Sequence, residues 1–135
     1  MSTSLLKQQH AQMAEIIQEL TSYPIESLVE KAFEISRKIG QLAGILTFHL
    51  QSEDKFLYPS LIKNESSQIR STAVAFTREM GDLGQKFATF KAKYMQPKNI
   101  KTDPKKFKEE LDAIAALLDN RIKKEERELY PLLGK

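Results

Sequence analysis

Two stretches of the chain share one frame and carry residue types that bind metal ions or pair charges. Residues 48–61 read FHLQSEDKFLYPSL, and residues 120–133 read NRIKKEERELYPLL. When the two are aligned on Tyr-Pro, both place an acidic pair ahead of a Leu-Tyr-Pro ending. The first copy carries a histidine four residues before its glutamate, whereas the second carries an arginine there. The frame therefore offers a metal ligand in one copy and a permanent cation in the other.

The first copy predicts metal binding. His49 precedes Glu53 by four residues, so on a helix the two side chains lie one turn apart on the same face and can chelate one ion together. His10 can supply a second imidazole and Glu125 a second carboxylate. Two nitrogens and two carboxylates suit iron, manganese or zinc, and the spacing does not choose among these metals. In the second copy, Arg121 takes the place that corresponds to His49.

The apolar pattern predicts four helices that would position these residues. In four segments, residues spaced alternately by four and three are nearly all apolar, which is typical of helices packed in a bundle. These positions are Leu6, His10, Met13, Ile17 and Leu20; Leu28, Ala32, Ile35, Ile39, Leu42, Leu46, His49 and Glu53; Ile69, Ala73, Phe76, Met80, Leu83, Phe87, Phe90 and Tyr94; and Phe107, Leu111, Ile114, Leu118, Arg121 and Glu125. No segment alternates with a period of two, so no strand is expected.

Prolines and capping residues suggest where the helices begin and end. Pro59 and Pro131 each follow a tyrosine, and because the residue before proline disfavours helix, a helix should end near each. The tyrosines before them are interpreted as markers of helix ends. Residues 64–68 offer several N-cap side chains for the third helix. Residues 96–104 read as a loop whose final Asp-Pro pair should cap and begin the fourth helix.

The predicted fold is an all-α, antiparallel up-down-up-down four-helix bundle that forms a single domain over residues 1–135. Five polar residues occupy positions on the apolar stripes: His10, His49, Glu53, Arg121 and Glu125. In an up-down bundle all five converge at one level of the core. Buried ions without partners cost several kcal/mol each, so the five must satisfy one another or a bound ion.

Composition excludes several other kinds of protein. The chain has no cysteine, which rules out disulfides, thiolate chemistry and iron–sulfur ligation. No signal-peptide pattern is visible, and the longest apolar stretch is too short to span a bilayer, so we expect a cytoplasmic protein without a membrane partner. The excess of lysine over residues 97–110 lacks the interleaved aromatics and arginines of a nucleic-acid site, so we interpret it as a solvated loop and helix start.

These features together resemble the hemerythrin-like, or HHE cation-binding, domain family. The resemblance covers essentially the whole chain and depends on an internal repeat. In the family pattern, each half has a helix with an early histidine, followed by a helix that ends in a histidine, an acidic pair and Leu-Tyr-Pro. QHAQMAEIIQEL with HLQSEDKFLYP is one half, and EMGDLGQKFATF with RIKKEERELYP looks like the other. Members typically hold two irons through histidines and two bridging carboxylates, and carry or sense oxygen, sense redox state, store iron or respond to nitric-oxide damage.

The resemblance implies a set of ligands in this chain. His10, His49 and Glu53 match the first half of the family pattern. Glu125 matches the second carboxylate, with Glu126 as the alternative because the family spacing varies by one. Glu125 is preferred since it lies on the apolar stripe, whereas Glu126 lies beside it.

The second half departs from the family pattern at two positions. Met80 and Arg121 stand where histidines are expected. A full di-iron centre is therefore not expected, and the resemblance implies at most one metal ion, with iron, manganese or zinc as candidates. In the alternative interpretation, Arg121 pairs with Glu53 and Glu125 in place of the metals, and Met80 fills apolar space.

Two functions remain open at this stage. The chain is either a cation-binding or sensing domain with an incomplete site, where a metal ion or a small diatomic molecule is the ligand, or a metal-free structural or interaction bundle. An enzyme that uses the polar layer for oxygen or nitric-oxide chemistry is less favoured, because such chemistry needs an open position on a redox-active metal. The sequence specifies no protein partner.

Overall fold

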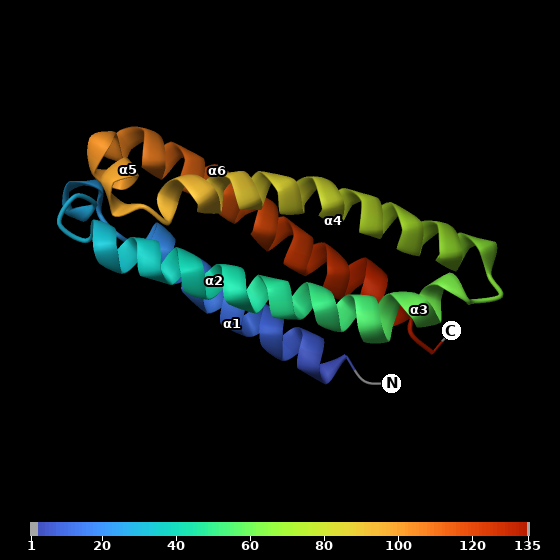
Figure 1. The fold of residues 1–135 in the computed structure, drawn as a ribbon. Helices are drawn as coiled ribbons and strands as arrows, with labels where there is room; N and C mark the ends of the chain where they lie inside the picture. The colour runs from blue at the N-terminus through green and yellow to red at the C-terminus, as the bar shows by residue number, and fades with distance from the viewer. Residues whose placement is uncertain (1–2, 135) are drawn as a thin grey trace.

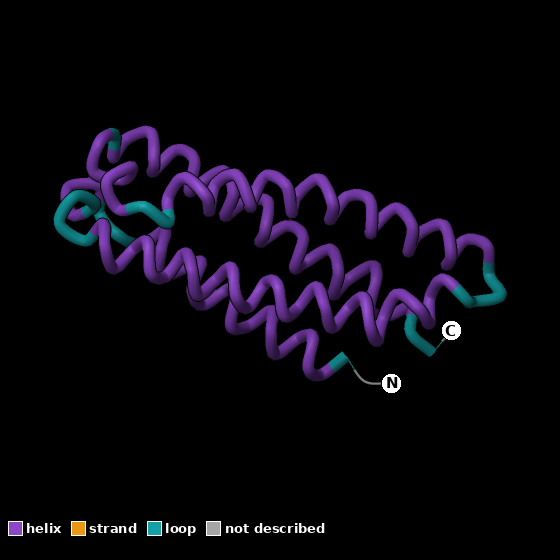
Figure 2. The backbone as a smooth tube through the Cα atoms, viewed as in Figure 1, coloured by secondary structure: helices purple, strands orange, loops and turns teal. Residues whose placement is uncertain are grey.

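The computed structural model describes residues 3–134, and most of them are helical. Four long helices lie side by side along one axis (Figure 1): α1 (Ser4–Thr21), α2 (Ala32–Ser52), α4 (Ser67–Tyr94) and α6 (Pro104–Lys124). Two short helices, α3 (Tyr58–Ile62) and α5 (Pro97–Thr102), lie at opposite ends of the molecule. Residues 3–134 contain no strand (Figure 2), which confirms the all-α prediction. Both short helices are additions to the predicted scheme.

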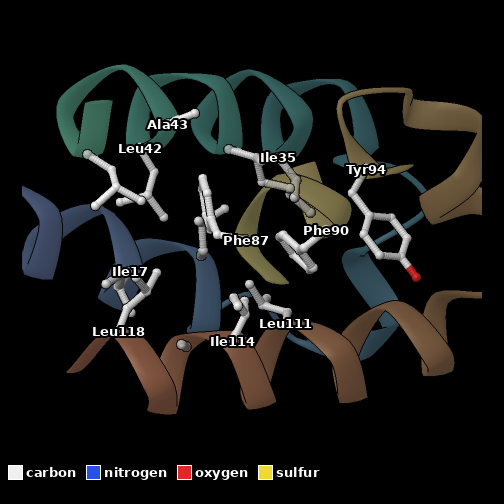
Figure 3. Packing of buried hydrophobic residues seen from close by; sticks show 14 of the residues in the cluster. Ile17, Ile35, Leu42, Ala43, Phe87, Phe90, Tyr94, Leu111, Ile114 and Leu118 are labelled. Carbon is white, nitrogen blue, oxygen red and sulfur yellow. The ribbon is translucent and has the colours of Figure 1, made fainter. Parts of the chain in front are cut away.

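The predicted apolar stripes form the core. Every predicted stripe position is buried except Ile69, which is half-buried. The larger hydrophobic cluster fills the body of the bundle, where Ile35, Phe87 and Leu118 point inward from three helices (Figure 3). A second, smaller cluster around Leu57 lies at the α3 end of the molecule. The polar stripe residues occur in sequence between members of these two clusters, so they form a polar layer that separates them.

Two short π-helical segments follow long helices and correspond to the repeated frame. Glu53–Leu57 continues α2 without a break, and Glu125–Leu129 continues α6. The bonding from residue i to residue i+5 in such turns is rare and occurs often at functional sites. Each segment begins at a buried glutamate, so each local distortion lies at the polar layer.

Two boundary predictions are confirmed by side-chain caps. The Ser66 side chain accepts a hydrogen bond from the Ile69 amide at the start of α4. Asp103 accepts one from the Lys106 amide at the start of α6. The 3-10 segment Tyr130–Leu132 is followed by extended backbone at Leu133, so the last helical run ends close to Pro131, as expected.

Two other boundary predictions were wrong, both because of proline in a first helical turn. The chain stays helical past Pro59 as far as Ile62, since Pro59 lies at the start of α3, where its missing N–H group is not needed. Residues 96–104 are not all loop, because Pro97 begins α5 in the same way.

Among the helices of residues 3–134, none is both long and apolar enough to cross a membrane.

Candidate metal centre

Four side chains meet in the polar layer. His10 from α1, His49 from α2, and the first residues of the two π-helical segments, Glu53 and Glu125, each direct one donor atom into a group whose members all lie within 4.8 Å of one another. Each of the four residues is at most 2% exposed. The convergence predicted from the stripes is therefore confirmed, although these residues are far apart in the sequence.

The two imidazoles direct the same nitrogen toward the carboxylates. The Nε2 atom of His10 lies 2.7 Å from Glu125 Oε1 and 3.1 Å from the Nε2 atom of His49. His49 Nε2 lies 3.2 Å from Glu125 Oε1 and 3.2 Å from Glu53 Oε2. The layer therefore contains a compact set of two nitrogens and two carboxylate oxygens, the donor set that the sequence predicted.

A chain of hydrogen bonds fixes the ring of His49. The Ser52 hydroxyl donates to the Phe48 carbonyl at 2.9 Å, so its oxygen accepts from Gln9 Nε2 at 3.2 Å. Gln9 Oε1 must then face His49 Nδ1, at 2.7 Å, and accept its hydrogen. Such an outer partner determines which ring nitrogen faces inward, and here it leaves Nε2 for the centre. Neither Gln9 nor Ser52 was predicted from the sequence to lie at the site.

His10 is fixed in the same way by Glu126. Its Nδ1 atom donates to Glu126 Oε2 at 2.7 Å, which leaves its Nε2 atom facing inward. Glu126 is 39% exposed and lies on the outer side of the ring. The structure thus places Glu125, and not Glu126, among the four converging donors, and Glu126 supports an imidazole from outside.

Arg121 lies on the outer side of Glu125. Its Nε atom donates to Glu125 Oε2 at 2.9 Å, while the other oxygen, Oε1, faces the two histidines. Its Nη2 atom donates to the Tyr58 hydroxyl at 3.1 Å, and its guanidinium lies 4.7 Å from the centre of the Phe76 ring. The guanidinium is therefore held by the outer oxygen of Glu125, by Tyr58 and by Phe76.

The predicted pairing of Arg121 was correct for Glu125 and wrong for Glu53. Among the described residues, Arg121 makes no hydrogen bond or ion pair with Glu53. Glu53 is bonded instead by His49 and by the Tyr130 hydroxyl, which donates to Glu53 Oε2 at 2.8 Å. The two carboxylates thus share His49 and Tyr130 as partners, whereas, of these two carboxylates, Arg121 and His10 bond Glu125 alone among the described residues.

Tyr130 is a residue of the polar layer that was not predicted from the sequence. It was interpreted as the marker of a helix end, yet it is 4% exposed and its hydroxyl lies among the four donors. Residues five apart lie on different faces of an α-helix, but the π-helical turn brings Tyr130 onto the face of Glu125. The repeated Leu-Tyr-Pro ending was the signal that could have identified it.

Met80 stands at a position where the family pattern has a histidine, and its surroundings are apolar. It is buried and belongs to the larger hydrophobic cluster. With Gly81, Gly84 and Tyr58 it lines a pocket of about 270 Å³ beside the polar layer. A Cβ atom added at either glycine would meet nothing within 4 Å, so both glycines border open space. The second half therefore offers a carboxylate and no imidazole.

Burial and neighbouring charges shift the pKa values of the layer. Burial disfavours the charged form of His49, but hydrogen bonds with Glu125 and Glu53 outweigh it and raise its pKa to about 9. Burial, with the negative charge of Glu125, raises the pKa of Glu53. Burial opposes ionisation of Glu125 as well, yet hydrogen bonds from His10 and His49, together with the charge of Arg121, hold its pKa well below the usual range.

The donor set fits one metal ion. Glu53 Oε1 is buried and has no hydrogen-bond partner among the described residues, which costs about 1–3 kcal/mol unless a cation or another donor reaches it. Both imidazoles already direct Nε2 inward, and Glu125 keeps one oxygen free of Arg121. The chain contains only two imidazoles, so the layer can offer no more than two nitrogen ligands.

Comparison with known proteins shows the family to which the chain belongs. The family model of the hemerythrin HHE cation-binding domain matches residues 1–133, so the chain belongs to that family. No curated protein and no solved structure matches the chain. The resemblance seen in the sequence is therefore confirmed over nearly the whole length.

The metal-free protein should lose stability as the pH rises from 6.5 to 9. His49 has a folded pKa near 9 against 6.5 when unperturbed. Its charged form thus adds stability that is fully present below pH 6.5 and is lost as the pH rises through 9. The loss is on the order of 3 kcal/mol, measured by urea unfolding with a chelator present. His49→Gln should remove this slope, whereas an equally steep slope in that variant would contradict the assignment.

Proposed function

We propose that the chain is a cation-binding and sensing domain that holds one metal ion through His10, His49, Glu53 and Glu125. The observation that supports this most strongly is the meeting of four buried donor atoms within 4.8 Å. Isolated ionisable groups are rarely buried without a partner, and metal binding satisfies all four at once. Iron, manganese and zinc are the candidates, because each accepts mixed nitrogen and carboxylate ligands.

The proposal takes the four long helices as an antiparallel up-down-up-down bundle. In this topology the beginning of α1 and the ends of α2 and α6 share one end of the molecule, where the ligands reside. Gln9 and Glu126 hold the two imidazoles in a binding orientation, and Arg121 holds the outer oxygen of Glu125. A bound iron ion would supply a redox-active centre at which a small diatomic molecule can bind.

We propose a binding role in the cytoplasm rather than catalysis. Met80 and Arg121 replace two expected imidazoles of the second half, so the site is incomplete relative to a di-iron centre. With fewer ligands, the protein has less control over the reactions of a bound metal. Reversible binding of an ion at one buried site is sufficient to sense a metal or its redox state.

A metal-free structural bundle is the second candidate, and one specific observation favours it. The carboxylates already have partners in the polar layer: Arg121 and the histidines for Glu125, Tyr130 and His49 for Glu53. The raised pKa of His49 favours its charged form, so His49 and Arg121 can both supply positive charge to the two carboxylates. On this account the layer is a self-paired network that fixes helix register, and no ion is required.

Elemental analysis distinguishes the two candidates. Protein expressed in medium supplemented with iron or manganese should copurify with about one equivalent of metal per chain, because the four ligands form one site. Removing the metal by chelation should lower the melting temperature, since an ion at 100 times its dissociation constant adds about 2.7 kcal/mol. His49→Ala should lose the metal, and the exposed variant Glu128→Gln should keep it. A metal-free parent with unchanged melting would contradict the binding proposal.

Replacing Arg121 tests the self-paired network. In metal-free buffer, Arg121→Ala should lower the free energy of unfolding by about 3–5 kcal/mol, because it leaves the buried Glu125 without its cation. Arg127→Ala is the matched control, since Arg127 is 73% exposed, and it should change stability by less than about 0.5 kcal/mol. Urea denaturation measures both. If the two variants are equally stable, the network contributes little and the second candidate fails.

Restoring the family histidines should add a second ion. Met80→His combined with Arg121→His supplies the two missing imidazoles on the faces of α4 and α6 that border the layer. The double variant should bind one more equivalent of metal than the parent, as measured by elemental analysis. Met80→Leu with Arg121→Lys is the control and should show no gain. An unchanged stoichiometry in the histidine variant would contradict the idea that these two replacements removed a second site.

A further inference from the structure

The hydroxyl of Tyr130 lies where the four donor atoms converge. Its oxygen is 2.8 Å from Glu53 Oε2, 3.1 Å from Glu125 Oε1, 3.1 Å from His10 Nε2 and 3.5 Å from His49 Nε2. A phenol has one proton to donate, yet two carboxylate oxygens face this one oxygen. A cation in contact with all three oxygens would remove that conflict.

The ring of Tyr130 is held in this position by its surroundings. It lies nearly parallel to the His10 ring, with 5.4 Å between ring centres and 12° between planes. The hydrophobic cluster at the α3 end encloses it together with Leu129, which is fully buried. The residue directly follows the π-helical segment Glu125–Leu129. The phenol oxygen is thus positioned by packing and local backbone geometry rather than by the hydrogen bonds alone.

Tyr58, the counterpart of Tyr130 in the first copy of the frame, is directed elsewhere. Its hydroxyl accepts a hydrogen bond from Arg121 at 3.1 Å and makes no hydrogen bond to the four donors among the described residues. The two copies of the frame therefore differ at the position of His49 or Arg121 and also in the direction of the tyrosine. The copy that has Arg121 also provides the tyrosine whose hydroxyl reaches the centre. The asymmetry predicts that only one of the two tyrosines can serve a bound ion.

We propose that Tyr130 is a fifth ligand of the metal ion and that the site is selective for ferric iron. This inference rests on the proposed function, because it needs an ion at the four donors. Tyr130 would release its proton to solvent and donate an oxygen electron pair to the ion. Two carboxylates and one phenolate then supply three anionic oxygens, which favour a hard, highly charged cation such as ferric iron over zinc.

The test is an optical titration of the purified full chain with ferric iron, supplied as its nitrilotriacetate complex. Iron bound by a phenolate shows a visible charge-transfer band, and light absorbed in that band enhances the vibrations of the phenolate ring in Raman spectra. We expect both signals in the parent at about one iron per chain. Tyr130→Phe should keep bound iron on the other four ligands and lose both signals. Tyr58→Phe is the matched control for a neighbouring buried tyrosine and should retain both.

Each outcome decides a different question. Iron bound to the parent without the visible band overturns the assignment of Tyr130 and leaves the four-ligand site intact, and this result does not depend on whether any variant folds. A band that persists in Tyr130→Phe, or disappears in Tyr58→Phe, also overturns the assignment. A parent that binds no iron, manganese or zinc removes the proposed function, and the inference with it.

Discussion

The structure depends on the burial of two carboxylates between two hydrophobic clusters. Glu53 and Glu125 are essentially inaccessible to solvent, and isolated buried carboxylates would each cost several kcal/mol. The groups around them supply positive charge or hydrogen bonds. Arg121 and His10 bond Glu125, and His49 contacts both carboxylates. The helix ends, the π-helical turns and the outer partners of the imidazoles all serve to bring these few groups together.

The same requirement can be met by a metal ion or by the protein's own cations, and this explains why the two candidate functions share one geometry. Arg121 illustrates the point, because it bonds the outer oxygen of Glu125 and leaves the inner oxygen to the histidines. It reduces the negative charge of the layer without blocking the centre. At an effective dielectric constant near 20, its repulsion of an ion beyond Glu125 is about a few kcal/mol, and the two carboxylates offset it.

Most features that were predicted correctly from the sequence depend on the periodic spacing of apolar residues. The stripe positions and the meeting of the polar stripe residues follow from the spacing of apolar residues, and Glu125 was preferred to Glu126 for that reason. The caps before α4 and α6 follow from the residue types at those boundaries. The π-helical turns, and with them the position of Tyr130, did not follow, because an inserted i+5 bond has no apolar signature. The Gln9–Ser52 hydrogen bonds were missed because polar side chains on a helix usually face solvent.

The central claim is that one ion binds among His10, His49, Glu53 and Glu125. Anomalous diffraction from crystals of metal-loaded protein, measured at the absorption edge of the bound metal, tests it directly. The account predicts one strong anomalous peak per chain, located between the two Nε2 atoms and the two glutamates. Two results would contradict it. One is a peak on the surface of the molecule. The other is a polar layer that holds no ion although metal is present in excess, with the carboxylates bonded by Arg121 and Tyr130 alone.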